Sequence, residues 1–210
     1  MSMKKLITIY CVVVAVMATT TVNASAVNFT GGTATLSDGT TVVPNNTVSW
    51  SNVDYYVEDG FKFDFIGGDG TLGTWNGWNN DDLHGHWATG SYGSLTSILV
   101  TKLDETPFDL TSFVLVTNTD MGGGAASGNE QTWINSSNGF SQLLPPEDWG
   151  YGAGSDPTII LGPEFSNITW VSFTVSNRVD CFGMDNFVPE PATICLLGLG
   201  ALGILKKRRA

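Results

Sequence analysis

Hydrophobic and polar residues alternate along much of the chain between residues 27 and 187. The alternation is clearest in the stretch 55–65. There, Phe61, Phe63 and Phe65 fall on one face, and polar residues fall on the other. A period of two is typical of a β-strand with one face in the core and the other in solvent. The stretch 55–65 is therefore predicted to be a half-buried strand.

Short runs rich in Val, Ile, Phe and Thr recur through the same region. Asp38-Gly39 is a hairpin signal between two of them, and Asp104 to Pro107 is expected to form a turn. No stretch shows the period of an amphipathic helix. Further strands are expected at residues 27–36, 40–50, 95–102, 108–118, 130–135, 140–144, 158–161, 168–175 and 179–187. About ten short strands without helices predict an all-β fold, a single jelly-roll-like β-sandwich.

The stretch 67–93 breaks this pattern, because it is rich in Gly, Asn, Asp and Trp. We expect a long loop there, and a long loop in a compact domain is either functional or disordered. Trp75, Trp78 and Trp87 lie within it, and Trp149 lies in a second loop. Exposed aromatic rings of this kind can form a platform for a glycan. The alternative, which we favour, is that they fold back as a lid on the core.

The first 26 residues form a separate segment. Lys4-Lys5 precedes an apolar run at 6–18, and Ala24-Ser25-Ala26 fits a small-residue cleavage site. This order predicts a secretory signal peptide, removed on export so that the mature protein begins at Val27. A retained signal anchor is the alternative.

The C-terminal segment, residues 188–210, contains two prolines, an uncharged apolar run at 192–205, and a basic cluster. The run predicts a helix of about 21 Å, short for a hydrocarbon core of roughly 30 Å. Flanking residues extend its reach, and the cations mark the cytoplasmic side. The basic cluster consists of Lys206, Lys207, Arg208 and Arg209.

This arrangement of motif, apolar helix and basic tail resembles the PEP-CTERM sorting signal of Gram-negative bacteria. The motif residues are Val188, Pro189, Glu190 and Pro191, followed by Ala-Thr. The resemblance implies export, here by the Sec machinery, and recognition by exosortase, a membrane-embedded cysteine transpeptidase-like enzyme. It implies cleavage near Pro189–Pro191 and transfer from the inner membrane to the cell surface or extracellular matrix. An ordinary C-terminal membrane anchor is the alternative.

Short blocks of the body also look like one recurrent class of PEP-CTERM body domain. The blocks are Glu58-Asp59-Gly60-Phe61, His84-Gly85-His86-Trp87, 107–113 and 182–187. The resemblance implies a jelly-roll similar to galactose-binding and carbohydrate-binding modules, with no established activity.

The body, residues 27–187, is strongly acidic. It keeps three basic residues, Lys62, Lys102 and Arg178, against nineteen Asp and Glu, a net charge of −16. That balance argues against nucleic acid and anionic lipid as partners. It suits an extracellular protein, where carboxylates can collect divalent cations.

Two metal hypotheses follow from the sequence. A structural calcium ion is the possible cofactor, with carboxylates of Glu58, Asp180 and Asp185 as the main candidates, together with Asp59 and Asn186. His84 and His86 share a face if they lie on a strand, and Asp81 and Asp82 are near enough in sequence to complete a site. The opposing interpretation is that these groups cap turns and form hydrogen bonds.

Catalytic motifs are absent from the sequence. There is no Gly-x-Ser-x-Gly elbow, P-loop or HExxH. Cys181, the body's one cysteine, is expected to be a small buried hydrophobe, since no basic partner lies close in sequence. We expect a non-enzymatic surface or matrix protein, with no catalytic residues, that is processed by exosortase. A carbohydrate-binding module for extracellular polysaccharide is the alternative, and a hydrolase is not favoured.

Overall fold

The computed structural model describes residues 26–44, 53–72, 83–87, 95–120, 131–147, 156–176 and 179–190. Within these ranges the chain is almost entirely β-structure, and its single helical element is the 3-10 turn η2 (Pro163–Phe165). The strands are β1 (Thr33–Leu36), β2 (Val42–Pro44), β3 (Val53–Glu58), β4 (Phe61–Ile66), β5 (Gly68–Leu72), β6 (Leu83–Trp87), β7 (Ser97–Lys102), β8 (Asp109–Asp120), β9 (Thr132–Ser136), β10 (Ser141–Leu143), β11 (Thr158–Ile160), β12 (Trp170–Val175) and β13 (Val179–Glu190). The all-β prediction is confirmed.

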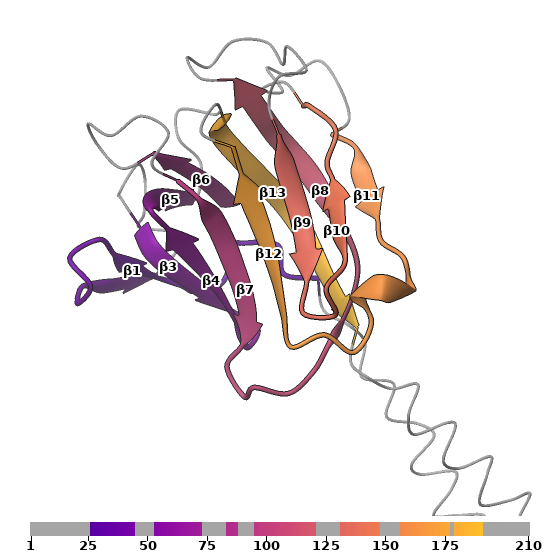
Figure 1. Ribbon diagram of the computed structural model, residues 1–210. Helices are drawn as coiled ribbons and strands as arrows, with labels where there is room; N and C mark the ends of the chain where they lie inside the picture. The colour runs from indigo at the N-terminus through magenta and orange to yellow at the C-terminus, as the bar shows by residue number, and fades with distance from the viewer. Residues whose placement is uncertain are drawn as a thin grey trace, which may run out of the picture.

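The strands form one antiparallel sheet in the order β10-β9-β12-β7-β4-β3-β5-β6-β13-β8-β11, and β1 pairs with β3 and β2 beside this path. The sheet curls, so that β9 and β12 lie in front of β8 and β13 (Figure 1). Phe173 of β12 stacks on Phe182 of β13 at 5.1 Å between ring centroids and meets Phe113 of β8 edge-on at 5.2 Å. The core therefore lies between two halves of one sheet. The jelly-roll arrangement stays a prediction.

The predicted alternation in β4 is confirmed, because Phe61, Phe63 and Phe65 are all buried. The prediction of a single strand over 55–65 is wrong. The strands β3 and β4 are separated by Asp59 and Gly60, whose φ angles are 48° and 82°. Two consecutive residues with positive φ form the tight hairpin turn that matches strand twist.

The hairpin predicted at Asp38-Gly39 is confirmed between β1 and β2, with Gly39 at φ 71°. The expected loop over 67–93 is wrong in part, because β5 and β6 lie within it and pair with each other. Their inward positions carry Gly70 and Gly85. A Cβ at Gly70 would lie 2.1 Å from the Phe65 ring, so neighbouring core side chains fill the space that a larger residue would occupy.

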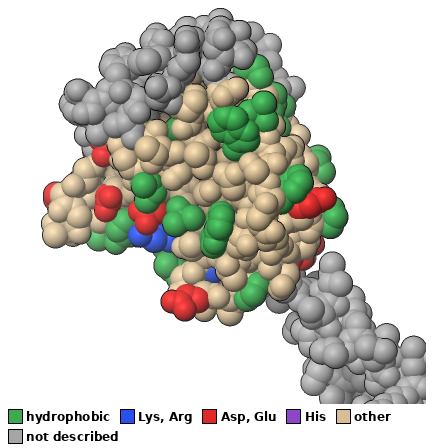
Figure 2. Space-filling view, in the orientation of Figure 1, with side chains coloured by type: hydrophobic (Ala, Val, Ile, Leu, Met, Phe, Trp, Pro, Cys, Tyr) green, Lys and Arg blue, Asp and Glu red, His purple; other side chains and the backbone are tan. Residues whose placement is uncertain are grey.

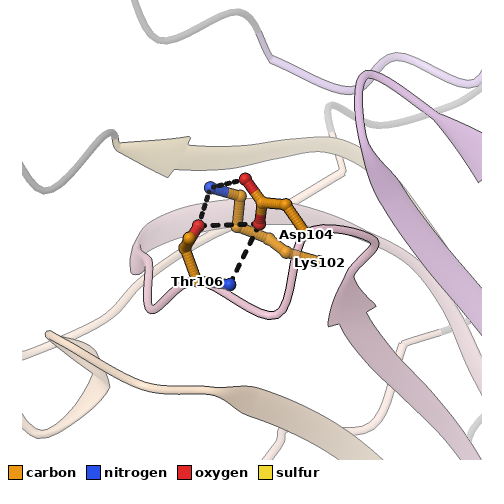
Figure 3. A network of polar contacts seen from close by, with 3 residues as sticks. All are labelled: Lys102, Asp104 and Thr106. Atoms are coloured by element: carbon orange, nitrogen blue, oxygen red, sulfur yellow. Dashed lines mark hydrogen bonds and ion pairs between the residues drawn. The ribbon is translucent and has the colours of Figure 1, made fainter.

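The turn predicted from Asp104 to Pro107 joins β7 to β8 and is held by three polar side chains (Figure 3). Asp104 Oδ1 accepts hydrogen bonds from the Thr106 hydroxyl at 2.7 Å and the Thr106 backbone N–H at 3.0 Å. These bonds, with the Lys102 charge, lower the pKa of Asp104. Lys102 Nζ also donates to Thr106 Oγ1 at 2.7 Å. The turn is thus stabilised locally, without burial.

The surface in the view of Figure 2 shows acidic side chains around its margin and basic side chains in its lower half. Exposed hydrophobic side chains are scattered, with Val42 59% and Ile160 73% exposed. Among the described residues no helix is long and apolar enough to cross a membrane. The predicted apolar helix at 192–205 and the basic cluster at 206–209 lie outside the described ranges, as does the predicted signal peptide up to Ser25.

Candidate functional site: the start of the sorting segment

The predicted sorting segment begins inside the folded sheet. Strand β13 runs without a break through Val188, Pro189 and Glu190, so the expected boundary after Phe187 falls within a strand. On β8, Val188 pairs with Ser112. The backbone is extended, as expected for a stretch preceding proline.

Side chains and backbone groups of β8 hold this end of β13. Pro189 pairs with Leu110 and Glu190 with Asp109, and the register shifts between Val188 and Pro189. Such an irregularity accommodates a proline, which has no N–H to donate to the ladder. Thr111 Oγ1 donates a hydrogen bond to the Val188 carbonyl at 3.1 Å.

Exposure changes sharply along the motif. Val188 is half-buried, Pro189 is buried, and Glu190 is exposed. Pro191 lies outside the described residues. Glu190 is therefore accessible and extended, whereas Pro189 belongs to the packed body. The body therefore presents the motif from Glu190 onwards.

The start of β8 is anchored where the tail leaves the sheet. Phe108 and Ile168 exchange two backbone hydrogen bonds of 2.9 Å. The neighbouring Asp109 is buried, and its Oδ1 accepts a 2.6 Å bond from the Asn167 N–H. Asn167 has φ 53°. A fixed β8 gives the last residues of β13 a rigid partner.

The tail that leaves this rigid end also matches a family model, that of the PEP-CTERM protein-sorting motif, over residues 187–209. This chain carries a PEP-CTERM sorting signal. The motif implies export and cell-surface sorting, with exosortase as the processing partner. No curated protein and no solved structure matches the chain. The PEP-CTERM match covers the tail, so the role of the body must be argued from its own residues.

The aromatic residues proposed as a glycan platform lie mostly outside the described part of this PEP-CTERM protein. Trp75, Trp78 and Trp149 fall outside it, and Trp87 is the last residue of β6. The platform therefore stays a prediction.

The proposed calcium residues are placed on two strands. Glu58, at the end of β3, is buried and accepts hydrogen bonds from the Tyr56 hydroxyl and the Gly31 N–H. Asp185 on β13 accepts a 2.6 Å bond from Asn186 Nδ2. Asp180 also lies on β13, near its start. Among the described side chains, no three His, Cys, Asp or Glu gather as a metal site, and the calcium hypothesis remains a prediction.

The histidines lie on a strand, β6, within the stretch 67–93 that was predicted to be a long loop. His84 is 2% exposed, and its Nδ1 lies 3.4 Å from Cys181 Sγ on β13. Cys181 is 3% exposed, which confirms the prediction of a buried cysteine. Its basic partner is thus His84, which lies on another strand and not close in sequence. The two positions are 97 residues apart in sequence, so no local sequence signal reveals this pair.

Proposed function

We propose that this chain is a non-enzymatic cell-surface or extracellular-matrix protein, exported by the Sec machinery. Its C-terminal segment holds it in the inner membrane until exosortase processes it. The observation that carries the proposal is the position of the motif. Glu190 is exposed at the end of a strand whose preceding residue, Pro189, is packed into the body.

This position suits processing of an already folded protein. Glu190 is the first exposed residue of the motif available to a membrane enzyme, and β8 pairing extends up to it, opposite Asp109. Processing beyond Pro189 leaves the whole of β13 up to that residue in the sheet. The finished body keeps its fold when it loses its membrane segment.

Mass spectrometry of both termini, on protein recovered from the cell surface, tests the sorting function. We expect an N-terminus at Val27 and a C-terminus within 189–191, with or without an attached group. An intact basic cluster at 206–209 in the membrane fraction would show a permanent anchor and overturn the proposal.

A linker insertion tests the part played by β8. Gly-Ser-Gly-Ser inserted after Phe187 would separate Val188 and Pro189 from their partners on β8. If pairing limits exosortase access, processing becomes faster in a pulse-chase experiment. The matched control is the same insertion between Asp104 and Glu105, in an exposed turn. Equal rates for the parent and the first variant would contradict a role for the pairing.

The alternative is a jelly-roll module that binds extracellular polysaccharide. It is supported by the positions of two segments beside the same part of β13. Trp87 directly follows His86, which pairs with Cys181 of β13. Glu147 pairs with Asn118 of β8, and Asn118 in turn pairs with Phe182 of β13. The chain around Trp87 and the chain leading to Trp149 thus approach one region of the sheet.

Affinity electrophoresis in matrix polysaccharide tests the alternative. Retardation of the parent, lost in Trp78→Ala and Trp87→Ala, would support glycan binding. Trp170→Ala is the matched control, since Trp170 is 37% exposed on β12, away from these segments in the strand order. Unretarded migration of the parent would remove the alternative.

A further inference from the structure

Four neighbouring strands bring the body's histidines and its cysteine to one face of the sheet. Residues opposite one another in antiparallel strands share a face, and so do residues two apart along a strand. Two adjacent rows cross β5, β6, β13 and β8: Asp69–His86–Cys181–Thr119 and Thr71–His84–Gly183–Thr117. Three residues of the types that bind transition metals, and one carboxylate, thus occupy one small area.

This face is the outer one, yet it is buried. The alternate residues of β13, Phe182 and Met184, belong to the core between the two halves of the sheet. On the outer face, Asp69 is 8% exposed and Thr117 and Thr119 are 0% exposed. Buried polar groups require partners. Thr117 Oγ1 has no hydrogen-bond partner among the described residues.

Gly183 makes room for the His84 ring. A Cβ built on Gly183 would lie 2.6 Å from the Cε1 and Nδ1 atoms of His84 and 2.9 Å from Thr117 Cγ2. The imidazole therefore lies close over the backbone of β13. Its Nδ1 is directed at the sulfur of Cys181, two residues earlier on the same strand.

We propose that His84, His86 and Cys181 bind a zinc-class divalent transition metal ion. Thiolate and imidazole are the donors that select such ions. A tetrahedral zinc with bonds of about 2.3 Å to sulfur and about 2.05 Å to nitrogen separates those two atoms by roughly 3.5 Å. The observed separation of Cys181 Sγ from His84 Nδ1 is 3.4 Å. These two donors already stand at the spacing of two ligands of one ion.

The pairing of β6 with β13 brings the third proposed donor, His86, next to Cys181. His86 is the residue directly opposite Cys181 and shares its face with His84. Residues directly opposite in an antiparallel pair have Cβ atoms about 4.5–5.5 Å apart, within reach of one ion. Asp69, opposite His86 on β5, accepts a 2.6 Å hydrogen bond from Ser37 Oγ. It supplies the carboxylate that orients a ligating histidine.

Burial favours a metal over a catalytic thiol. A Cys–His nucleophile must reach its substrate, whereas His84 and Cys181 are 2% and 3% exposed. A single metal ion occupies far less space than a substrate, so it can be bound by buried side chains. The site is separate from the sorting motif, so it can be tested without exosortase.

Cobalt titration of the full chain in detergent is the test, in a Cys11→Ala, Cys195→Ala background so that Cys181 is the one thiol. We expect one equivalent of Co²⁺ to give a thiolate-to-cobalt charge-transfer band and tetrahedral d–d absorption, both displaced by Zn²⁺. No such bands in this protein would overturn the proposal without any ligand variant.

Variants assign the donors. Cys181→Ser should lose the charge-transfer band, and His84→Gln and His86→Gln should each lose the tetrahedral spectrum. Asp69→Asn should weaken binding about 10- to 100-fold, as for other groups that orient a ligand. Asp59→Asn, in the β3–β4 turn, is the control. Cobalt bands that survive both histidine substitutions would overturn the site. If a variant does not fold, the proposal is tested on the Cys11→Ala, Cys195→Ala protein, which keeps all the proposed ligands. Zn²⁺ should raise its melting temperature, and no such stabilisation would also overturn the proposal.

Discussion

Val27 and Phe187 exchange two backbone hydrogen bonds, from Val27 N to Phe187 O at 2.8 Å and from Phe187 N to Val27 O at 2.9 Å. Val27 is the residue expected to begin the mature protein, and Phe187 is the last residue before the sorting motif. Both are fully buried. The expected first residue of the mature protein is therefore held by the sheet to the residue that precedes the sorting motif.

The N-terminal segment supplies core contacts as well as this pairing. Phe29 is buried, and its ring meets Phe63 edge-on at 5.1 Å between centroids. We expect Phe29→Ala to lower the free energy of unfolding by about 3–5 kcal/mol. Urea titration followed by near-UV circular dichroism measures the change. Val42→Ala, at an exposed position, should stay within about 0.5 kcal/mol. Equal effects of the two substitutions would contradict the packing of Phe29.

A side chain at position 183 is predicted to destabilise the fold. Gly183→Ala places a methyl group 2.6 Å from the His84 ring, between two paired strands. Overpacking of this kind costs about 1–3 kcal/mol. Gly31→Ala is the matched control, because its nearest atom, Glu58 Oε1, lies at an ordinary 3.7 Å. A thermal melt in which Gly183→Ala is the more stable of the two would show that this area is loosely packed.

Asp38 gives a prediction for acid solution. Hydrogen bonds from the Thr41 hydroxyl and the backbone N–H groups of Thr41 and Thr40 lower the pKa of Asp38 from 3.8 to about 2. Since the folded value is the lower one, the stabilisation is present above the unfolded pKa and is lost as the pH falls through about 2. Carbon-13 NMR of the carboxyl group measures the pKa directly. Thr41→Val should raise it, and an unchanged value would rule out the hydroxyl as the main cause.

Tyr56 gives a prediction for alkaline solution. Burial, and next the hydrogen bond to Glu58, raise the pKa of Tyr56 far above its ordinary value. A raised pKa stabilises the fold below the unfolded value of about 10, and this contribution is lost as the pH rises above it. Spectrophotometric titration should find one tyrosine that ionises only on unfolding. Its assignment fails if Tyr56→Phe leaves that group in place.

Tyr56→Phe also removes a hydrogen-bond donor from a buried carboxylate. Glu58 would keep the Gly31 N–H at 3.3 Å. Loss of a hydrogen-bond partner by a buried polar group costs about 1–3 kcal/mol. Tyr55→Phe is the control for that stability change, since the Tyr55 ring lies 4.3 Å beneath Lys62 Nζ and the substitution keeps the ring.

Period-two alternation predicts β4 and β12 well, because their alternate residues are phenylalanines and valines that enter the core. It fails to show the hairpin at Asp59-Gly60 because Glu58, a polar residue, holds a buried position of β3. The buried positions change from even to odd numbers across this turn, from Tyr56 and Glu58 to Phe61. That change of phase is the signal that divides the stretch into two strands.

The strands β5 and β6 could not be found from hydrophobicity. Their core-facing positions include Gly70 and Gly85, which make way for side chains of β4 and β7. The His84–Cys181 pair depends on strand order, which local patterns do not determine. The sequence does not predict the extension of β13 through Pro189, because proline ordinarily argues against a paired strand. The sorting motif itself was predictable, since its order of segments is linear in sequence.

The place of β13 in the sheet has a consequence for the timing of assembly. It is the last strand in the chain, yet it lies between β6 and β8 and not at an edge. Contacts between distant parts of a chain form late, because closing long loops is entropically costly. An exported body of this topology completes its sheet only after its C-terminal strand has crossed the membrane. At that moment the residues that follow are the sorting segment, so translocation, closure of the sheet and presentation of Glu190 become steps in one sequence.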